Sequence, residues 1–219
     1  MLINKTKPPN NPSENSGKMT SQHKEHLYPS PVKLAPKKKI KKSQIYKFWY
    51  NVYYLEMGRN RKYVNLDQKM LIDEFEPNSD CLYVENNNAI VGTSRIITND
   101  TPFGYYYNFY ALDLFGQDSY CVVTKYMVDQ NNRSGRLGYI LALATVEYCK
   151  RKGIKWIVID CSPIRYDYFA KLGFEEHLGL AHSPEYGEVK IMKFDVFGNT
   201  RCPLNDPLMT NKYKQLFQF

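Results

Sequence analysis

The pattern of apolar and polar residues predicts a helix and a hairpin early in the folded part of the chain. In residues 43–58, SQIYKFWYNVYYLEMG, a serine suited to a helix N-terminus precedes apolar residues at helical spacing, and Gly58 stands where such a helix would end. Residues 81–85 (CLYVE) and 89–97 (AIVGTSRII) have strand character, and the asparagines between them are typical of a hairpin turn. The tyrosine-rich stretch at 103–109 leaves its structure open.

The next part of the chain has the pattern of a strand–helix–strand unit. Residues 119–128, SYCVVTKYMV, are apolar on both faces and rich in β-branched and aromatic side chains, as in a buried central strand. An apolar helical stripe follows from Leu137 to Tyr148, and Gly153 ends this helix after a basic last turn. Residues 154–161, IKWIVIDC, form a second buried strand, which a right-handed crossover places parallel to the first.

A short helix ended by Gly173 and two strand-like runs, FEEHLG and EVKIMKFDV, complete the pattern. The order is a helix, a run of strands, then alternating strands and helices. It predicts an α/β fold with a mixed sheet and helices on both faces.

Charge changes this picture only near the N-terminus. The net charge is +8, yet residues 1–45 carry ten of the 30 basic residues and two of the 22 acidic ones, so the remaining chain has 20 of each. We therefore expect a disordered basic leader over 1–43, a folded domain over 44–198 and a C-terminal tail over 199–219. The leader is either a solvated tail or a docking segment for an acidic partner, and a nucleic acid or an anionic membrane is the less favoured partner.

Several classes of protein are disfavoured by composition. No apolar run approaches the length of a membrane span, and the first residues lack a secretory pattern, so a cytoplasmic protein is expected. The five cysteines and four histidines are dispersed, without the spacing of a disulfide framework or a metal site.

The junction between strand and helix at 128–143, VDQNNRSGRLGYILAL, has the composition of an anion site. A helix N-terminus offers unpaired N–H groups and a positive dipole end. Gly135 and Gly138 would let the backbone approach a phosphate closely, and Arg133 and Arg136 would add charged donors. An ordinary strand–helix turn relieved by glycines is the alternative.

The run RSGRLGYILALATVEYCKRKGIKWIVIDC, with YFAKLGFEE further on, resembles the core of the GCN5-related N-acyltransferases (GNAT). Arg133 and Gly138 occupy outer positions of the superfamily's loop pattern, and Arg136 stands where an inner glycine is usual. Upstream, the sequence resembles the acyl-homoserine-lactone synthases and the long-chain N-acyl amino acid synthases. Residues that fit their motifs are Val52, Tyr53, Asp73, Phe75, Gly92 and Arg95, with Thr124, Lys125 and Tyr126 standing for a Ser-Arg-Phe element.

Three departures from these motifs argue against a homoserine lactone as the product. Trp49 replaces an arginine, Glu76 replaces an aspartate, and Val122 stands where the autoinducer synthases have a glutamate.

The resemblance implies a GNAT fold, a mostly antiparallel mixed sheet with a splayed central parallel pair and helices on both faces. It implies transfer of an acyl group, with a fatty acyl group favoured, from acyl-CoA or an acidic acyl carrier protein to the amine of an amino acid, small amine or peptide side chain. No permanently bound cofactor is implied, because the thioester is a co-substrate. A bulge at 125–128 would let the pantetheine lie between two strands. The donor-binding residues would be Tyr126, Met127, Val128, Arg133, Ser134, Gly135, Arg136, Leu137, Gly138 and Tyr139.

The catalytic acid and base follow less directly from the resemblance. Phe169 occupies the superfamily's usual tyrosine position, which leaves the adjacent Tyr168 as the acid candidate. Asp73 and Glu76 are base candidates, and Arg95 is a candidate clamp for the acceptor's carboxylate. Alternatively the acids form a solvated loop cluster, and Arg95 pairs with one of them to hold the strands together.

Two other functions remain open at this stage. One is acetyl transfer from acetyl-CoA to a small molecule or a protein. The other is a GNAT-like module that binds without catalysis, which Arg136 in place of glycine keeps in play. Aromatic side chains that could line an acyl tunnel or simply pack are Tyr105, Tyr106, Tyr107, Phe109 and Tyr110.

Overall fold

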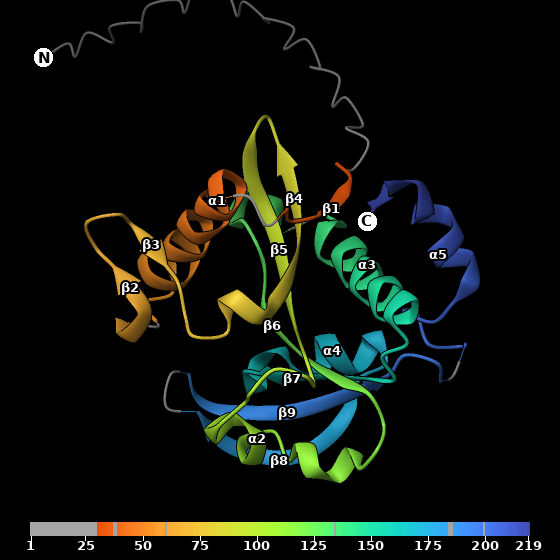
Figure 1. Ribbon diagram of the computed structural model, residues 1–219. Helices are drawn as coiled ribbons and strands as arrows, with labels where there is room; N and C mark the ends of the chain where they lie inside the picture. Colours follow the sequence, from red (N-terminus) through yellow and green to blue (C-terminus); the bar gives the residue numbers. More distant parts are fainter. Residues whose placement is uncertain (1–29, 37–38, 60, 134, 184–185, 199) are drawn as a thin grey trace, which may run out of the picture.

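The computed structural model describes residues 30–36, 39–59, 61–133, 135–183, 186–198 and 200–219. Its framework is an eight-stranded sheet with the strand order β10-β1-β4-β5-β6-β7-β9-β8 (Figure 1). The strands of this sheet are β1 (Val32–Leu34), β4 (Ser79–Asn86), β5 (Ala89–Thr98), β6 (Tyr120–Val128), β7 (Trp156–Cys161), β8 (Glu175–Ser183), β9 (Gly187–Asp195) and β10 (Phe217–Gln218). A separate antiparallel pair joins β2 (Val64–Asn65) to β3 (Met70–Leu71).

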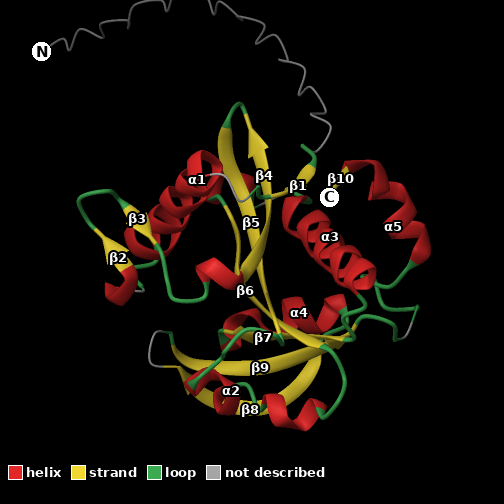
Figure 2. Cartoon of the chain, in the orientation of Figure 1, coloured by secondary structure: helices red, strands yellow, loops and turns green. Residues whose placement is uncertain are grey.

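Helices cover both faces of the sheet, as Figure 2 shows for α1 on one side and α3 and α5 on the other. The α-helices are α1 (Lys39–Trp49), α2 (Tyr105–Phe109), α3 (Leu137–Lys152), α4 (Tyr166–Leu172) and α5 (Pro207–Tyr213), and α1 continues as π-helix over Tyr50–Glu56. The apolar stripe of α3 packs on one face of β6 and β7. Trp49 and its neighbours in α1 pack on the opposite face of β4 and β5. Each face of the sheet is therefore buried under helical cover.

The predicted hairpin and the predicted strand–helix–strand unit are both confirmed. Strands β4 and β5 are antiparallel, and their turn places Asn87 and Asn88 at φ values of 49° and 63°, the left-handed region that asparagine tolerates. Strands β6 and β7 are parallel neighbours joined by α3, which ends at the left-handed Gly153. The tyrosine-rich stretch that the sequence left open contains the short helix α2.

The parallel pair at the centre of the sheet separates soon after it begins. Strands β6 and β7 are paired only from Tyr120 with Trp156 to Val122 with Val158. Beyond that point β6 contains a bulge, where its register with β5 shifts and Lys125 takes a φ of 49°. The predicted fold, a mixed and mostly antiparallel sheet with a splayed parallel pair, is confirmed.

Secondary structure extends beyond the predicted domain at both ends of the folded part. Residues 32–34 form β1, which pairs with β4, and α1 begins at Lys39, inside the segment predicted to be a disordered leader. Two basic side chains of that segment, Lys33 and Lys41, bind the carboxylate of Glu85 at 2.8 and 2.6 Å. Basic composition alone does not distinguish such anchored lysines from a solvated tail. Residues 1–29 lie outside the described part.

The C-terminal segment also belongs to the fold. Helix α5 packs against α3, and β10 pairs with β1 in parallel, so the C-terminus lies beside β1 (Figure 2). Tyr213 and Phe217 are buried against the main core. Helix α5 has only seven residues and β10 only two, so neither element is long enough to show a clear hydrophobic period in the sequence.

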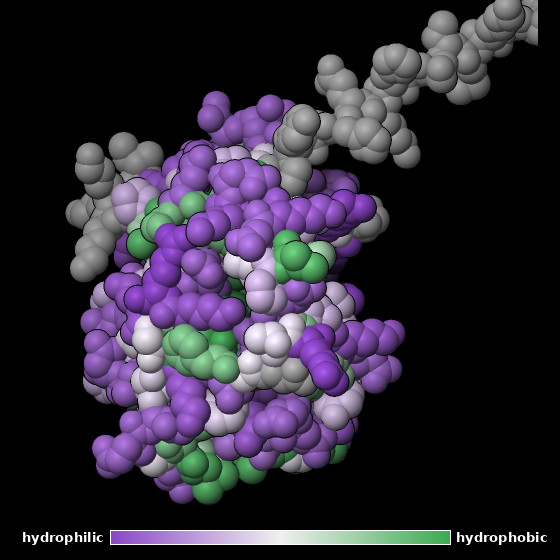
Figure 3. Space-filling view, turned by 90° about the vertical axis from the view of Figure 1, so that its right-hand side faces the viewer, coloured by the Kyte–Doolittle hydropathy of each residue, from purple (hydrophilic) through white to green (hydrophobic). Residues whose placement is uncertain are grey.

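On the described part of the face shown in Figure 3, hydrophobic side chains form small patches separated by hydrophilic ones. Within the described residues, no helix is both long and apolar enough to cross a membrane.

Candidate active site

A cavity of about 530 Å³ occupies the space where β6 and β7 separate. Side chains from both sides of the sheet reach it. Two strands form its floor, β6 with Val122 to Val128 and β7 with Ile159 to Cys161. The wall on the α1 side is formed by Tyr53, Arg59 and Tyr63 together with the aromatic residues Phe75, Phe103, Tyr106 and Tyr110. The wall around α3 and α4 is formed by Arg133, Gly135, Gly138, Tyr139, Tyr168 and Phe169. The size is typical of a pocket for a small molecule.

One end of the cavity lies at the N-terminus of α3. The helix has Arg136 as its N-cap, without a side-chain cap, so the N–H groups of Leu137, Gly138 and Tyr139 have no partner within the helix. Gly138 allows close packing here, because a Cβ on it would lie 3.3 Å from Tyr168 Oη and 3.6 Å from Tyr126 Oη. This end of the cavity has the free donors and the helix dipole that suit a phosphate.

The two arginines of the predicted anion loop differ in position. Arg133 lines the cavity, donates from Nε to the carbonyl of Val128 at 2.9 Å and forms an ion pair with Glu56. Arg136 is exposed at the helix N-cap and does not line the cavity. Ser134, also predicted in this loop, lies outside the described residues.

Two tyrosines meet above the first turn of α3. Tyr126 Oη donates to the carbonyl of Gly138 at 2.5 Å and lies 3.3 Å from Tyr168 Oη. Because the single hydroxyl proton of Tyr126 is used on Gly138, Tyr168 donates within the tyrosine pair. Burial raises the pKa of Tyr126 well above its ordinary value, and Tyr168 raises it further, so Tyr126 stays neutral. Tyr168, with 39% of its surface exposed, is the more accessible of the two hydroxyls at the cavity wall.

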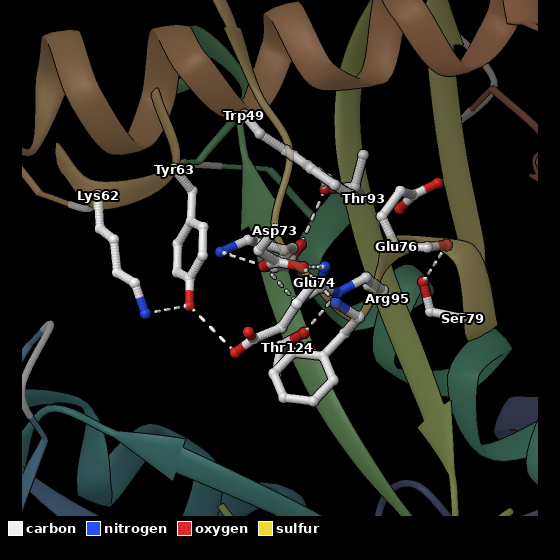
Figure 4. A network of polar contacts seen from close by, with 12 residues as sticks. Trp49, Lys62, Tyr63, Asp73, Glu74, Glu76, Ser79, Thr93, Arg95 and Thr124 are labelled. Atoms are coloured by element: carbon white, nitrogen blue, oxygen red, sulfur yellow. Dashed lines mark hydrogen bonds and ion pairs between the residues drawn. The ribbon is translucent and has the colours of Figure 1, made fainter. Parts of the chain in front are cut away.

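The guanidinium of Arg95 is fully engaged with neighbouring residues. Both terminal nitrogens donate to the carboxylate of Asp73, one of them to Oδ2 at 2.8 Å, and Nε donates to Thr124 Oγ1 at 2.8 Å (Figure 4). The ring of Trp49 lies 5.3 Å from the guanidinium carbon. Arg95 is 1% exposed. Of the two roles that the sequence leaves open for Arg95, the structure shows the ion pair, and the clamp role would require that pair to break.

Asp73 has its charge shared between two cations. Besides Arg95, the ammonium of the buried Lys125 lies 3.4 Å from Asp73 Oδ2. Burial alone would raise the pKa of Asp73, but the charges of Arg95 and Lys125 and the N–H of Phe75 outweigh it and lower that pKa below the ordinary value. A carboxylate held in this way is a poor proton acceptor, so the geometry does not favour the predicted role of Asp73 as a base.

Glu76, the second predicted base, is not brought to the cavity. It is buried, and its Oε1 accepts hydrogen bonds from Tyr46 Oη at 2.6 Å and Lys42 Nζ at 2.8 Å, both in α1. Its carboxylate points away from Asp73 and Arg95 (Figure 4). The short 3₁₀ helix at Glu76–Asn78 turns this side chain toward α1, a change of direction that sequence spacing does not reveal.

Asp160 and Arg59 are two charged residues of the cavity that sequence reasoning missed. Asp160 lies near the end of β7 and accepts a hydrogen bond from Tyr110 Oη at 3.2 Å. Arg59 follows the left-handed Gly58 and places its guanidinium 5.8 Å from the ring of Tyr186. An aspartate within the otherwise apolar run IVIDC is a signal that could have pointed to Asp160. Nothing in the sequence sets Arg59 apart from other arginines.

Comparisons with known proteins identify the family. The model of the family described as N-acyl amino acid synthase FeeM matches residues 44–195, more than two thirds of the chain. No curated protein matches the sequence significantly.

Solved structures show the same fold at low sequence identity. BjaI, described as a CoA-dependent acyl-homoserine lactone synthase with SAM and isopentyl-CoA, has a TM-score of 0.67 and 17% identity, over 84% of this chain and 90% of its own. FeeM, an N-acyl amino acid synthase from uncultured soil microbes, has a TM-score of 0.59 and 15% identity, over 75% of this chain and 89% of its own. An N-acetyltransferase from Staphylococcus aureus Mu50 has a TM-score of 0.51 and 11% identity, over 76% and 97%. The chain therefore has the GNAT fold, belongs to the N-acyl amino acid synthase FeeM family and is an N-acyltransferase that uses an acyl thioester.

Proposed function

We propose that this enzyme transfers a fatty acyl group from CoA or an acyl carrier protein to the amine of a free amino acid. The observation that carries the proposal is that one continuous cavity runs from the N-terminus of α3 through the gap between β6 and β7. It ends at a polar wall that contains the charged side chains of Arg59, Asp73 and Asp160. A thioester donor needs an anion site, a channel and an acceptor site in that order. The amino acid as acceptor comes from the description of the family.

The donor's pyrophosphate binds at the first turn of α3. The N–H groups of Leu137, Gly138 and Tyr139 bind it there, and Arg133 adds charge. The pantetheine then occupies the gap where β6 and β7 no longer pair. The main chain of Tyr126, Met127 and Val128 on the β7 side of the bulge supplies N–H groups that polarise the thioester carbonyl. Support comes from BjaI, whose structure contains isopentyl-CoA on the same fold.

The chemistry is direct transfer from thioester to amine. The neutral amine attacks the thioester carbonyl, and the tetrahedral intermediate collapses by breaking the carbon–sulfur bond. The departing thiolate takes a proton from Tyr168 Oη, and the new amide nitrogen gives up a proton in return. Tyr168 is suited to this step because its hydroxyl already acts as a donor toward Tyr126 beside the first turn of α3.

The acyl chain is long, and the aromatic cavity wall supports this part of the proposal. Of the aromatic residues predicted from the sequence, Tyr106 and Tyr110 line the cavity. Tyr105 and Tyr107 are exposed at the surface, and Phe109 packs against Tyr110 with ring centroids 4.9 Å apart. Phe75 and Phe103 contribute two further rings. Acetyl transfer would leave most of this apolar wall without a ligand.

The test is release of free thiol from a panel of acyl-CoA and acyl-carrier-protein donors, each offered amino acids and simple amines. We expect release to require both substrates and to be fastest with long acyl chains and amino acids, with mass spectrometry identifying an N-acyl amino acid. If acetyl-CoA were the only donor that supported transfer to an amine, the alternative would be established, a small-molecule or protein N-acetyltransferase. Release that is equally fast with amines lacking a carboxylate would contradict the amino acid as acceptor.

A further inference from the structure

The polar wall of the cavity contains a charged side chain that neighbouring residues do not neutralise. Arg59 lines the cavity, is partly buried and makes no ion pair with any residue that the structure describes. A row of stacked groups separates Arg59 from Asp73. The guanidinium of Arg59 lies 5.8 Å from the ring centre of Tyr186, and the ring of Tyr186 packs on Tyr53 with centroids 5.8 Å apart. The ammonium of Lys125 lies 4.4 Å from the ring centre of Tyr53, on the side of Asp73. The aromatic rings hold the guanidinium in place and leave its N–H donors available.

The carboxylate of Asp160 lies on the face of the sheet opposite α3 and also lines the cavity. Val122 is paired with Val158 across the parallel strands, and Asp160 lies two residues beyond Val158. Because side chains alternate along a strand, Asp160 is on the face of the sheet that carries Val122 and Val158, opposite the α3 side. Asp160 is the last residue of that face before β7 ends.

Tyr110 fixes the orientation of Asp160. Its hydroxyl donates to Asp160 Oδ1 at 3.2 Å, and burial together with Asp160 keeps the pKa of Tyr110 well above its ordinary value. The phenol therefore remains a hydrogen-bond donor across the pH range of interest. Asp73, the other carboxylate on the described cavity wall, is bound by Arg95 and Lys125.

We propose that Arg59 and Asp160 together form the acceptor site, in which Arg59 binds the carboxylate of the amino acid and Asp160 binds its amino group. This assignment rests on the proposed function and replaces Arg95 as the carboxylate ligand. The two charges are of opposite sign and line the same cavity, as an α-amino acid zwitterion requires. Arg59 presents a planar fork that can donate two parallel hydrogen bonds to a carboxylate.

Asp160 also has a chemical task in this assignment. The acceptor arrives as an ammonium ion, which cannot attack a thioester. Asp160 accepts one proton from it, leaving a neutral amine with a lone pair for the carbonyl carbon. In the whole reaction the thioester and the ammonium give the amide, the free thiol and one proton, which leaves Asp160 for the solvent before the next cycle.

The experiment compares an α-amino acid with the amine that remains after its carboxylate is removed. The donor is the best acyl thioester from the panel described above. Arg59→Gln should raise KM for the amino acid by about 10- to 100-fold, the effect of a lost hydrogen bond to a charged group, and leave kcat/KM for the amine within about threefold. Lys69→Gln, an exposed lysine in the turn between β2 and β3, is the matched control and should change neither value.

Asp160→Asn is tested by its pH profile. It should lower kcat at pH 7 on both acceptors by about 100-fold, the lower end of what general base catalysis contributes, and recover activity as the pH rises toward the pKa of the acceptor's amine. A merely structural role would lower kcat by the same factor at every pH. Asp160→Glu, which keeps the carboxylate, should retain more activity than Asp160→Asn.

Two results would overturn the assignment. The first is an equal loss of kcat/KM for the amino acid and for the amine in Arg59→Gln, with an unchanged melting temperature. The second is a pH profile of kcat for Asp160→Asn that runs parallel to that of the wild type. Calorimetry of amino acid binding to the CoA-saturated protein gives a readout independent of turnover. If the wild type binds amino acids but transfers no acyl group, the proposed function fails, while loss of that binding in Arg59→Gln would still support the site. Unchanged binding in Arg59→Gln would refute it.

Discussion

The guanidinium of Arg95 binds both carboxylate oxygens of Asp73 inside the wall of the cavity (Figure 4). Arg95 is on β5, and Asp73 is on the segment between β3 and the next 3₁₀ helix, so the pair joins two parts of the chain that are separated by 22 residues. Both side chains are nearly inaccessible. An ion pair in such a place shapes the cavity and is costly to break on one side only.

Removal of one partner of this pair should destabilise the protein strongly. Asp73→Asn leaves the charge of Arg95 buried beside Lys125, and we expect a loss of about 3–5 kcal/mol in the free energy of unfolding, measured by urea denaturation. The double variant Asp73→Asn, Arg95→Met should lose less than the sum of the two single losses. Glu175→Gln is the control, because its pair with Lys193 is exposed and should contribute less than about 1 kcal/mol. Additive losses would show that the two residues act independently.

The same pair predicts how stability depends on pH. The pKa of Asp73 is lowered in the folded protein below its ordinary value of 3.8, so the unfolded chain binds its proton at a higher pH than the folded protein does. The stabilisation is therefore complete above pH 3.8 and is lost as the pH falls through the lower folded value. Urea denaturation between pH 5 and 3 should show a shallower loss of stability in Asp73→Asn than in the wild type. Parallel curves would mean that Asp73 does not carry this dependence.

The sequence predicts the fold well and the roles of individual side chains less well, for a physical reason. Hydrophobic periodicity and turn chemistry are local, and they define the hairpin at Asn87 and Asn88 and the strand–helix–strand unit that ends at Gly153. The bulge at Lys125 follows from the resemblance and not from the residues alone, because a lysine within an apolar strand fits several conformations. What escapes sequence reasoning is the direction of a side chain after an irregular turn, as at Glu76.

The chain ends illustrate the same limit. A short strand such as β1 is stabilised mainly by its partners β4 and β10, which are distant in sequence. The lysines around it are ordered by a single distant carboxylate, Glu85. Neither contact leaves a local pattern. Arg59 is a further case, because its place in the cavity is set by Tyr186, more than a hundred residues away.

Charge reversal in the loop before α3 should weaken binding of the donor. Arg133→Glu and Arg136→Glu should each reduce the affinity for CoA by about 1–3 kcal/mol, measured by calorimetry, and leave the fold intact because both side chains lie at the surface. The larger effect is expected at Arg133, which lines the cavity. Lys69→Glu, away from the cavity, is the control for a change in overall charge. Unchanged affinity in both loop variants would refute the anion site.

Removal of the hydroxyl of Tyr168 should slow the chemical step and spare donor binding. Tyr168→Phe keeps the ring at the cavity wall but leaves the thiolate without its proton donor, so we expect kcat to fall by about 100-fold with KM for the donor nearly unchanged. Tyr107→Phe is the matched control, since Tyr107 has a similar exposure and does not line the cavity. A kcat within a few-fold of the wild type would assign the proton transfer to another group or to water.

The length of the acyl chain should affect catalysis through the aromatic cavity wall. Each methylene group that the wall buries contributes about 0.8 kcal/mol, so kcat/KM should rise by roughly fourfold per carbon until the cavity is full and then stay level. Measured with a series of acyl-CoA donors from acetyl upward and one fixed acceptor, this gives a curve whose plateau reports the depth of the pocket. Phe103→Ala removes a buried ring from the wall and should change the response to chain length, whereas Phe197→Ala, an exposed ring outside the cavity, should leave it unchanged. A maximum at acetyl that falls with every added carbon would rule out a fatty acyl donor, because a wall of this kind cannot favour the shorter chain by burial.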